Sequence, residues 1–562
     1  MRRMGFLMRS RRTGAGMAAI LVVTMAWAQV PMTAQDFHVP GTQVGDMPLS
    51  ALRPASECKT CHGDFDPANE PYATWAGSLM ALGGHDPLFF AQMTTANQDV
   101  ANVGSFCLRC HVPAAVVTGH VANPSGSSLD ARDREGVTCH FCHSMVDPQY
   151  QAGVSPPEDL AVLAALAAIP NYTANAMFVL DPQGRRRGPR SDHQASHELL
   201  VSPFLREAKL CGTCHDVGNV ATTKLPDGRY RYNLVNTEAP DHDPWMQFPL
   251  ERTYTEWKLS AFASGGVDLG GRFGGNRGPV VSTCQDCHMP TTSAQACYYG
   301  PTRNDMATHD FAGAAVPSLD LIAAYTAGDL DIDQGTIAAG RAKALSMLQR
   351  AATIELHRDG DDLVARVLNH SGHKLPTGHI EGRRVWLNLK FFDGTGTLID
   401  ERGHYDPVEA HLDEAGTTVY EMQVALSEDA AIATGLPAGL STHMALADTL
   451  WKDTRIPPRG FNNASFANAG APVVGISYAD GQYWHEQRVV LPAGSVRIIA
   501  TLYYQSLPRH YIDTLRDANV SDDWGDTLHT LWQNTGRGAP IVMASESLSF
   551  VDTLLIDGFE GP

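Results

Sequence analysis

The segment Cys58-Lys-Thr-Cys61-His62 decides the fold of this chain, because its pattern of two cysteines three residues apart followed by histidine occurs five times. The other copies are Cys107-Leu-Arg-Cys110-His111, Cys139-His-Phe-Cys142-His143, Cys211-Gly-Thr-Cys214-His215 and Cys284-Gln-Asp-Cys287-His288. We number them motif 1 to motif 5 in chain order. In this spacing both thiols can add to the vinyl groups of one porphyrin while the adjacent imidazole binds the iron. The sequence therefore predicts five covalent haem c groups, with the five motif histidines as iron ligands.

Other uses of paired cysteines fit this pattern less well. A zinc site would group the pairs in fours and would leave the histidine after each pair without a purpose. Thioredoxin-like redox motifs do not come in fives, and a disulfide framework would not repeat this spacing. The eleventh cysteine, Cys297, lies outside the motifs. We interpret it as a small buried residue, with an intermolecular disulfide as the alternative.

Length and charge narrow the class of protein. The chain has 562 residues, of which 43% are hydrophobic and 18% charged, and this length favours about two to four domains. Acidic residues number 61 and basic residues 42, which gives a net charge of −19. Such a surface repels phosphate backbones, which argues against nucleic-acid binding. It predicts instead redox partner proteins with basic docking faces.

The N-terminus has the pattern of an export signal. Five arginines lie within the first twelve residues and precede an apolar run, residues 17–28, that ends in Ala26-Trp27-Ala28. We predict a signal peptide at residues 1–28, with cleavage as late as residue 34 as the alternative. A dozen apolar residues are fewer than the ~20 that span a bilayer, so removal is favoured over a membrane anchor. No later stretch is long enough to span, and the expected location is periplasmic or extracellular.

The motifs divide the chain into a haem-bearing first half and a second half without cysteine. We expect a loop-rich, mainly helical pentahaem domain at residues 35–315, a helical connector at 316–352 and a haem-free, β-sandwich-like domain at 353–562, which together give an α+β fold. Short helices are predicted at 71–82, 157–168 and 254–263. Alternating apolar residues predict strands at 352–357, 363–368, 384–392, 489–491, 495–504 and 549–556, with an inserted helix at 510–518.

A weak internal repeat lies within the first half. The pattern Tyr72-x-x-Trp75-x-x-Ser78, followed by two glycines, recurs as Tyr254-x-x-Trp257-x-x-Ser260, also followed by two glycines. We interpret the two tryptophans as structural residues on equivalent helices that pack beside haem edges.

Several segments resemble the multihaem c-type cytochromes related to the tetrahaem electron carriers of ammonia oxidisers. In the first half these are Glu57-Cys58-Lys-Thr-Cys61-His62 followed by the Tyr-x-x-Trp segment, Gly136-Val-Thr-Cys-His-Phe-Cys-His143, Leu210-Cys-Gly-Thr-Cys-His215, Cys284-Gln-Asp-Cys-His-Met-Pro290 and Thr308-His309-Asp-Phe311-Ala-Gly313. The segment Asn369-His-Ser-Gly-His373-Lys-Leu-Pro-Thr-Gly378, with Arg383, Arg384 and Trp386, resembles the β domain of longer members. The resemblance implies electron transfer outside the cytoplasm, with two histidines on most irons. It also exposes a departure, because relatives often have a ligating histidine where this chain has Met80 and Phe262.

The motifs do not fix the ligand on the second side of each iron. Of 23 histidines, 18 lie outside the motif positions, so most must be bystanders. His309 is the first choice because it lies just past the last motif, and one of His193 and His197 is expected to ligate. The remaining candidates are His120, His140, His85, His242, His373 and Met80. For His373 a loop-stabilising role is the alternative, and for Met80 it is core packing.

Five haems within residues 35–315 predict closely packed porphyrins. Electrons can pass between porphyrins in such an arrangement, so the sequence predicts an electron carrier. The main alternative is an oxidoreductase, similar to nitrite, hydroxylamine or sulfur-oxyanion reductases, with one five-coordinate iron whose open side is lined by Arg, Lys, Tyr or His. A third hypothesis is a subunit of a conductive filament or redox complex. No catalytic residue is predicted under the electron-carrier hypothesis.

Overall fold

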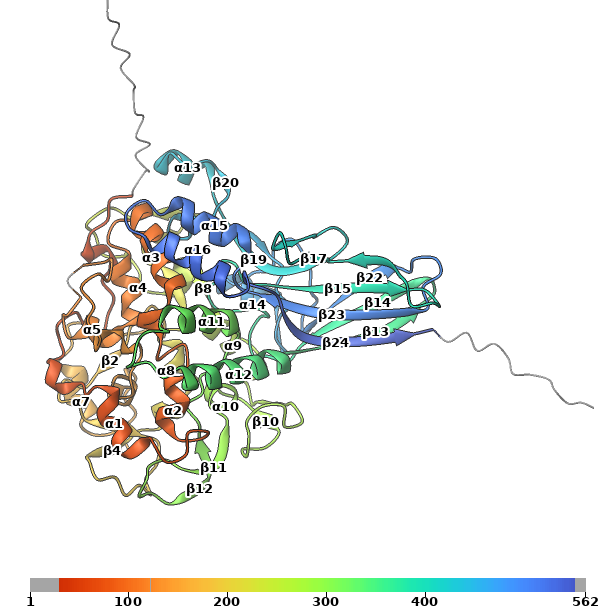
Figure 1. Cartoon of the computed structure of the whole chain (residues 1–562). Helices are drawn as coiled ribbons and strands as arrows, with labels where there is room; N and C mark the ends of the chain where they lie inside the picture. Colours follow the sequence, from red (N-terminus) through yellow and green to blue (C-terminus); the bar gives the residue numbers. More distant parts are fainter. Residues whose placement is uncertain (1–29, 122, 551–562) are drawn as a thin grey trace, which may run out of the picture.

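The computed structural model describes residues 30–121 and 123–550. The predicted signal peptide and nearly all of the predicted strand at 549–556 lie outside this part. Figure 1 shows a rounded body formed by the first half of the chain, from which a long set of strands projects. We call residues 30–315 the motif region and residues 352–550 the sheet region. Helices dominate the body and long strands the projection, so the predicted α+β class is confirmed.

The motif region consists of short helices and two-stranded sheets joined by loops. Its helices are α1 (Ala55–His62), α2 (Pro71–Ala76), α3 (Pro87–Asp99), α4 (Gly104–His111), α5 (Pro113–Val117), α6 (Cys139–His143), α7 (Asp159–Ala164), α8 (Ala208–Gly212), α9 (Thr253–Lys258) and α10 (Cys284–His288). Its paired strands are β1 (Met145–Val146) with β2 (Val179–Leu180), β3 (Arg186–Gly188) with β4 (Leu199–Val201), β5 (Val217–Asn219) with β8 (Phe248–Glu251), β6 (Thr222–Lys224) with β7 (Tyr230–Tyr232), β9 (Val267–Asp268) with β10 (Val280–Val281), and β11 (Thr291–Gln295) with β12 (Thr302–Ala307).

The sheet region contains a three-stranded and a seven-stranded antiparallel sheet. The smaller sheet has the order β13 (Ala352–Asp359), β14 (Asp362–Asn369) and β22 (Trp484–Val490). The larger one has the order β20 (Gly439–Leu440), β19 (Val419–Leu426), β15 (Arg384–Phe392), β23 (Arg497–Gln505) and β24 (Ile541–Ser549), with β16 (Leu398–Arg402) beside β15 and β21 (Thr449–Asp453) beside β19. A hairpin joins β17 (Tyr405–Asp406) to β18 (His411–Leu412), and four helices complete the region: α13 (Glu428–Thr434), α14 (Asn463–Asn468), α15 (Arg509–Ala518) and α16 (Trp524–Asn534).

One hydrophobic core joins the two sheets. Alternate residues of β14 and β15, including Leu363, Val367, Leu387 and Phe391, lie in the same buried cluster, as expected where every second side chain of a strand faces inward. Residues of β13, β22, β23 and β24 complete this cluster.

Two connecting helices, α11 (Val316–Tyr325) and α12 (Gln334–Arg350), tie the sheet region to the body. Helix α12 crosses α2 at Gly340 and Gly77, where a Cβ added to Gly340 would lie 1.8 Å from the Gly77 carbonyl oxygen. Helix α2 ends at Ala76 with Gly77 as its C-cap, rather than at residue 82 as predicted. Helices α15 and α16 pack on α3 through a second buried cluster that includes Tyr511 and Trp532.

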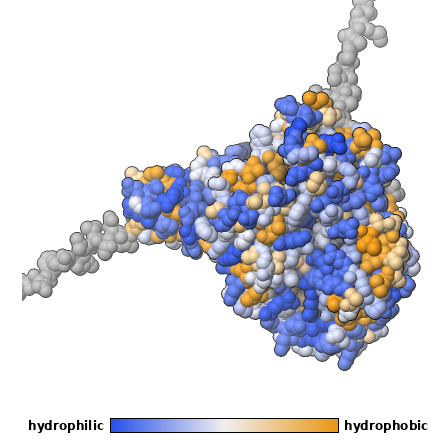
Figure 2. Space-filling model, turned by 180° about the vertical axis from the view of Figure 1, so that it is seen from behind, coloured by the Kyte–Doolittle hydropathy of each residue, from blue (hydrophilic) through white to orange (hydrophobic). Residues whose placement is uncertain are grey.

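The part of the chain that the structure describes contains no helix long and apolar enough to cross a membrane. On the face shown in Figure 2 the surface is mostly hydrophilic, and hydrophobic side chains gather on one side of the rounded body.

Candidate haem sites

Short helical turns present each motif. In α6 and α10 the helix consists of the motif itself, and Thr138 or Thr283 caps its N-terminus with a side-chain hydrogen bond. Residues three apart on a helix lie on one side, so the two thiols of a motif share a side and the histidine follows one residue later. The spacing of the motif therefore determines the relative positions of the two thiols and the imidazole.

Cysteines of different motifs lie in contact inside the body. The neighbouring thiols are those of Cys58 in motif 1 and Cys139 in motif 3, Cys110 in motif 2 and Cys214 in motif 4, and Cys211 in motif 4 and Cys284 in motif 5. Motif 3 also adjoins motif 4: burial raises the pKa of Cys142 to about 12, and nearby Cys211 adds to this increase. The five attachment points thus form one connected cluster.

Three motif histidines each face another histidine at nearly the same distance. The ring centres are 6.5 Å apart for His62 and His197, 6.4 Å for His143 and His309, and 6.5 Å for His288 and His373. A bond between a metal and an imidazole nitrogen is about 2 Å long, so two imidazoles on opposite sides of one iron have ring centres roughly 6 Å apart. The residues present therefore fit three irons, each held between two histidines.

In five of these six histidines the other ring nitrogen is directed to a backbone carbonyl. Nδ1 of His62, His143 and His288 donates to the carbonyl oxygens of Ala296, Arg187 and Ala312, at 2.7, 2.7 and 2.6 Å. Nδ1 of His197 and His373 likewise donates to the carbonyls of Glu198 and Lys374, both at 3.0 Å. A donor at Nδ1 fixes the tautomer that leaves Nε2 free to bind a metal.

The internal repeat has a structural counterpart in two equivalent hydrogen bonds. Nε1–H of Trp75 donates to the carbonyl of Val137 at 2.9 Å, and Nε1–H of Trp257 donates to that of Ser282 at 2.7 Å. Each carbonyl lies two residues before the first cysteine of a motif, motif 3 in one case and motif 5 in the other. The tryptophans thus hold equivalent helices, α2 and α9, against equivalent motifs.

The six other candidates for a second ligand have different surroundings, and their role as ligands stays a prediction. Both ring nitrogens of His140 contact the backbone, at Arg53 and Gly184. Nε2 of His242 lies 2.9 Å from Glu238. Burial lowers the pKa of His85, with Arg134 nearby. Two more candidates are His193, whose Nδ1 is buried without a hydrogen-bond partner among the described residues, and Met80, which is half-buried.

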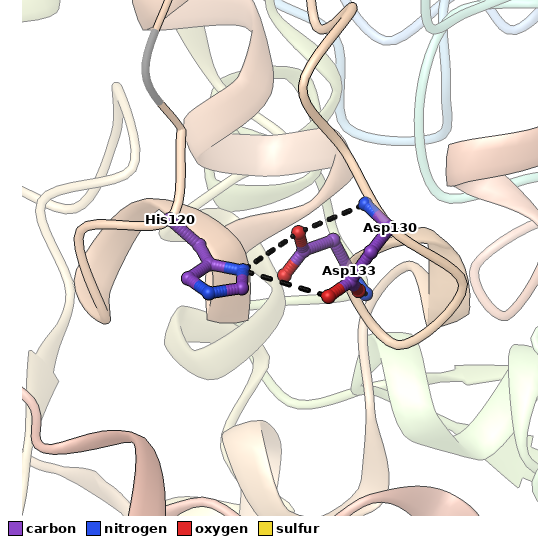
Figure 3. Close-up of side chains that lie close together, drawn as sticks. All are labelled: His120, Asp130 and Asp133. Atoms are coloured by element: carbon purple, nitrogen blue, oxygen red, sulfur yellow. Dashed lines mark hydrogen bonds and ion pairs between the residues drawn. The ribbon is translucent and has the colours of Figure 1, made fainter.

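His120 lies in a cluster with Asp130 and Asp133 (Figure 3). Its Nδ1 is 3.0 Å from Asp133 and 3.8 Å from Asp130, and the imidazole is 45% exposed. The hydrogen bond with Asp133 raises the pKa of His120. This exposed ion pair directs the imidazole toward carboxylates rather than toward a motif histidine.

Motif histidines His111 and His215 differ from the other three, because within the described residues neither has a second histidine ring at such a distance. The ring of His111 stacks on Phe89, with centres 3.7 Å apart. Nδ1 of His215 contacts Glu251 at 3.4 Å. Although burial opposes both shifts, this contact raises the pKa of His215 to about 9 and lowers that of Glu251 to about 2.

A polar cluster that sequence reasoning missed lies beside His111. Burial lowers the pKa of His379 to about 3, and the neighbouring charges of Arg383 and His111 contribute to the shift. Nε2 of His379 is 3.2 Å from the hydroxyl of Tyr511, which donates to Gln92 at 2.8 Å. His379 directly follows the segment 369–378, which resembles other cytochromes and contains His373. This position next to the segment is the only sequence feature that could have pointed to His379.

No family model matches the chain, and no curated protein matches it. Among solved structures it is similar to a penta-heme cytochrome c552 from Thermochromatium tepidum, with 18% sequence identity and a TM-score of 0.47 over 90% of this chain and 100% of the other.

Proposed function

We propose that this protein carries electrons through c-type haems attached at the five motifs. The observation that carries the proposal is the set of three histidine pairs at 6.4–6.5 Å, each with one member in a motif. When bound, a haem of this type supplies an iron that takes up and releases one electron, at a potential set by its ligands and surroundings.

The chain's own residues contribute attachment, orientation and exclusion of water. Cysteines in mutual contact bring the attachment points of motifs 1 and 3, 2 and 4, and 4 and 5 together. Backbone carbonyls orient the imidazoles. Buried aromatic side chains such as Phe141 and Phe178 pack against Cys142 and Cys110 and keep water from the cluster.

The location and partners belong to the same proposal. The N-terminal pattern supports export to the periplasm or beyond the cell, and the excess of acidic over basic residues supports docking of basic redox proteins. Assembly into an oligomer or filament is a further part of this proposal, to be checked by the mass of the purified protein in solution.

The test is the haem content of the protein expressed with its own signal and a cytochrome c maturation system. Intact mass after denaturation should show five covalent haems. Replacing both cysteines of one motif by alanine should remove one haem each time, whereas Cys297→Ser should remove none. A parent protein without covalent haem would refute the proposal.

The polar cluster beside His111 favours a second candidate function. This is the reduction of a nitrogen or sulfur oxyanion or of hydroxylamine. Histidine, arginine and tyrosine are the residue types expected around an open iron, and His379, Arg383 and Tyr511 meet there. Carbon monoxide added to the reduced protein separates the two functions. An unchanged spectrum supports the carrier alone, and a change at one haem that Tyr511→Phe or Arg383→Gln modifies supports the enzyme.

A further inference from the structure

The two copies of the repeat differ in how they hold the loop that bears the second histidine. In the first copy Thr74, the residue before Trp75, accepts a hydrogen bond from the backbone N–H of His309 at 3.0 Å. In the second copy Glu256, the residue before Trp257, accepts one from the backbone N–H of Lys374, next to His373, also at 3.0 Å. Equivalent positions on α2 and α9 therefore hold the loops that carry His309 and His373.

The second copy uses a carboxylate where the first uses a hydroxyl, and that carboxylate is fully buried. Glu256 is 0% exposed, and an unpaired charge at such a place is strongly unfavourable. Nη1 of Arg455 lies 3.1 Å from Glu256. Arg455 in turn contacts both carboxylate oxygens of Asp453, at 2.8 and 2.7 Å.

Lys374 closes the network. Its Nζ donates to Asp453 at 2.7 Å and to the carbonyls of Ala471 and Pro472 at 2.9 and 2.8 Å, so all three ammonium protons have acceptors. The lysine side chain is 0% exposed and that of Asp453 1%. Two carboxylates and two cations balance in charge, which is the condition under which buried ions are tolerated.

The network crosses from the motif region to the sheet region. Glu256 lies in α9, Lys374 in the loop between β14 and β15, and Asp453 at the end of β21. The same loop is fixed at its other end, where Oγ1 of Thr377 donates to Glu256 at 2.8 Å. His373 directly precedes the first of these anchors, and its ring centre lies 6.5 Å from that of His288.

We propose that Glu256, Lys374, Asp453 and Arg455 form a positioning network that holds His373 as the second iron ligand at motif 5. The sheet region is then part of a haem site rather than an appendage. This inference rests on the proposed function, because it requires a haem at motif 5. Its residues act through His373 and are positioning residues.

The test compares three variants of the complete holoprotein by electron paramagnetic resonance of the ferric state. His373→Ala removes the ligand itself, and Lys374→Met removes one cation of the network. Lys452→Met is the matched control, because Lys452 is the neighbour of Asp453 on β21 and pairs with Glu421 at 2.8 Å outside the network. Haem content and circular dichroism confirm that each variant is folded and loaded.

We expect His373→Ala and Lys374→Met to lose the same low-spin signal and gain one high-spin signal, with carbon monoxide binding after reduction. Lys452→Met should retain the spectrum of the parent. The inference is overturned if Lys374→Met keeps the parent spectrum, or if His373→Ala does. A parent without covalent haem would instead defeat the proposed function.

Should Lys374→Met not be recovered, Glu256→Gln serves in its place, because the amide keeps an acceptor oxygen but removes the charge opposite Arg455. We expect a fraction of the same iron to become high-spin. An unchanged spectrum in this variant counts against the network as well.

Discussion

Glu251 accepts a hydrogen bond from Nδ1 of His215 over 3.4 Å, and within the described residues it is the only carboxylate that contacts a motif histidine. Backbone carbonyls play this role for His62, His143 and His288. A carboxylate partner makes an imidazole a stronger donor to its metal. The motif 4 site should therefore favour ferric iron more than the others do.

Glu251→Gln should raise the reduction potential of the haem at motif 4. A hydrogen bond to a charged partner is worth about 1 kcal/mol more than one to a neutral partner, which corresponds to roughly 40 mV for one electron. Spectropotentiometric titration measures the change. Glu486→Gln is the control, because Glu486 pairs with Arg366 in the sheet region rather than with a candidate ligand. A shift of equal size in both variants would contradict the prediction.

Trp75→Phe and Trp257→Phe should each destabilise the holoprotein by about 1 kcal/mol, the usual net contribution of one hydrogen bond. The affected carbonyls are those of Val137 and Ser282. Denaturant unfolding measures the effect, with Trp451→Phe as the control because Trp451 is 54% exposed. If Trp75→Phe and Trp257→Phe cost no more stability than Trp451→Phe, the structural role of the repeat would be wrong.

Gly340→Ala should destabilise the protein by about 1–3 kcal/mol through overpacking, because the new methyl group would collide with the Gly77 carbonyl. Thermal unfolding of the variant measures the loss. Gly328→Ala is the control, since no atom lies within 4 Å of a Cβ added there. Equal stability of the two variants would show that α2 and α12 can separate without cost.

The contact of His443 with Asp99, 2.8 Å long, should make stability fall as pH rises. The hydrogen bond with Asp99 raises the pKa of His443 above 6.5, so its stabilisation is complete below that pH and is lost as pH rises through the higher folded value. Burial raises the pKa of Asp99 above 3.8, which acts in the same direction.

His443→Gln should therefore flatten the decline of unfolding free energy above pH 6.5 by about 1.5 kcal/mol, the lower end of the range for one hydrogen bond to a charged group. Denaturant unfolding at several pH values measures it. Replacement of the exposed His411 by Gln should leave the slope as it is, and an unchanged slope in His443→Gln would refute the assignment.

Reduction by a basic donor protein should slow as ionic strength rises, because salt screens attraction toward the acidic surface. Stopped-flow reduction at increasing salt measures this dependence, and a neutral small-molecule reductant provides the control. Rates indifferent to salt would refute the proposed docking.

The motifs predict the cofactor chemistry and the α+β class, since both depend on local patterns of two to ten residues. The sequence also indicates the repeat and its packing role, but not the hydrogen-bond acceptors of Trp75 and Trp257, which lie far along the chain. The helix expected at 71–82 ends at Ala76 in the structure, next to the close approach of Gly77 to Gly340.

The histidines that face the motif histidines cannot be identified from spacing, because only the tertiary structure brings the two members of each pair together. His309 was placed first among them because it lies near motif 5, yet in the structure it faces His143 of motif 3. His379 belongs to no motif, and only folding brings it to Arg383 and Tyr511. The burial of Lys374 also depends on tertiary structure, since lysines are ordinarily exposed.

The facing of His288 by His373 also has a consequence for truncation. His288 belongs to the motif region and His373 to the sheet region, so under the proposed function attachment at motif 5 and completion of its ligand set depend on different parts of the chain. A chain cut at the end of the motif region could receive its haems and still lack one ligand. Truncation at that boundary would therefore not yield a smaller version of the same electron carrier.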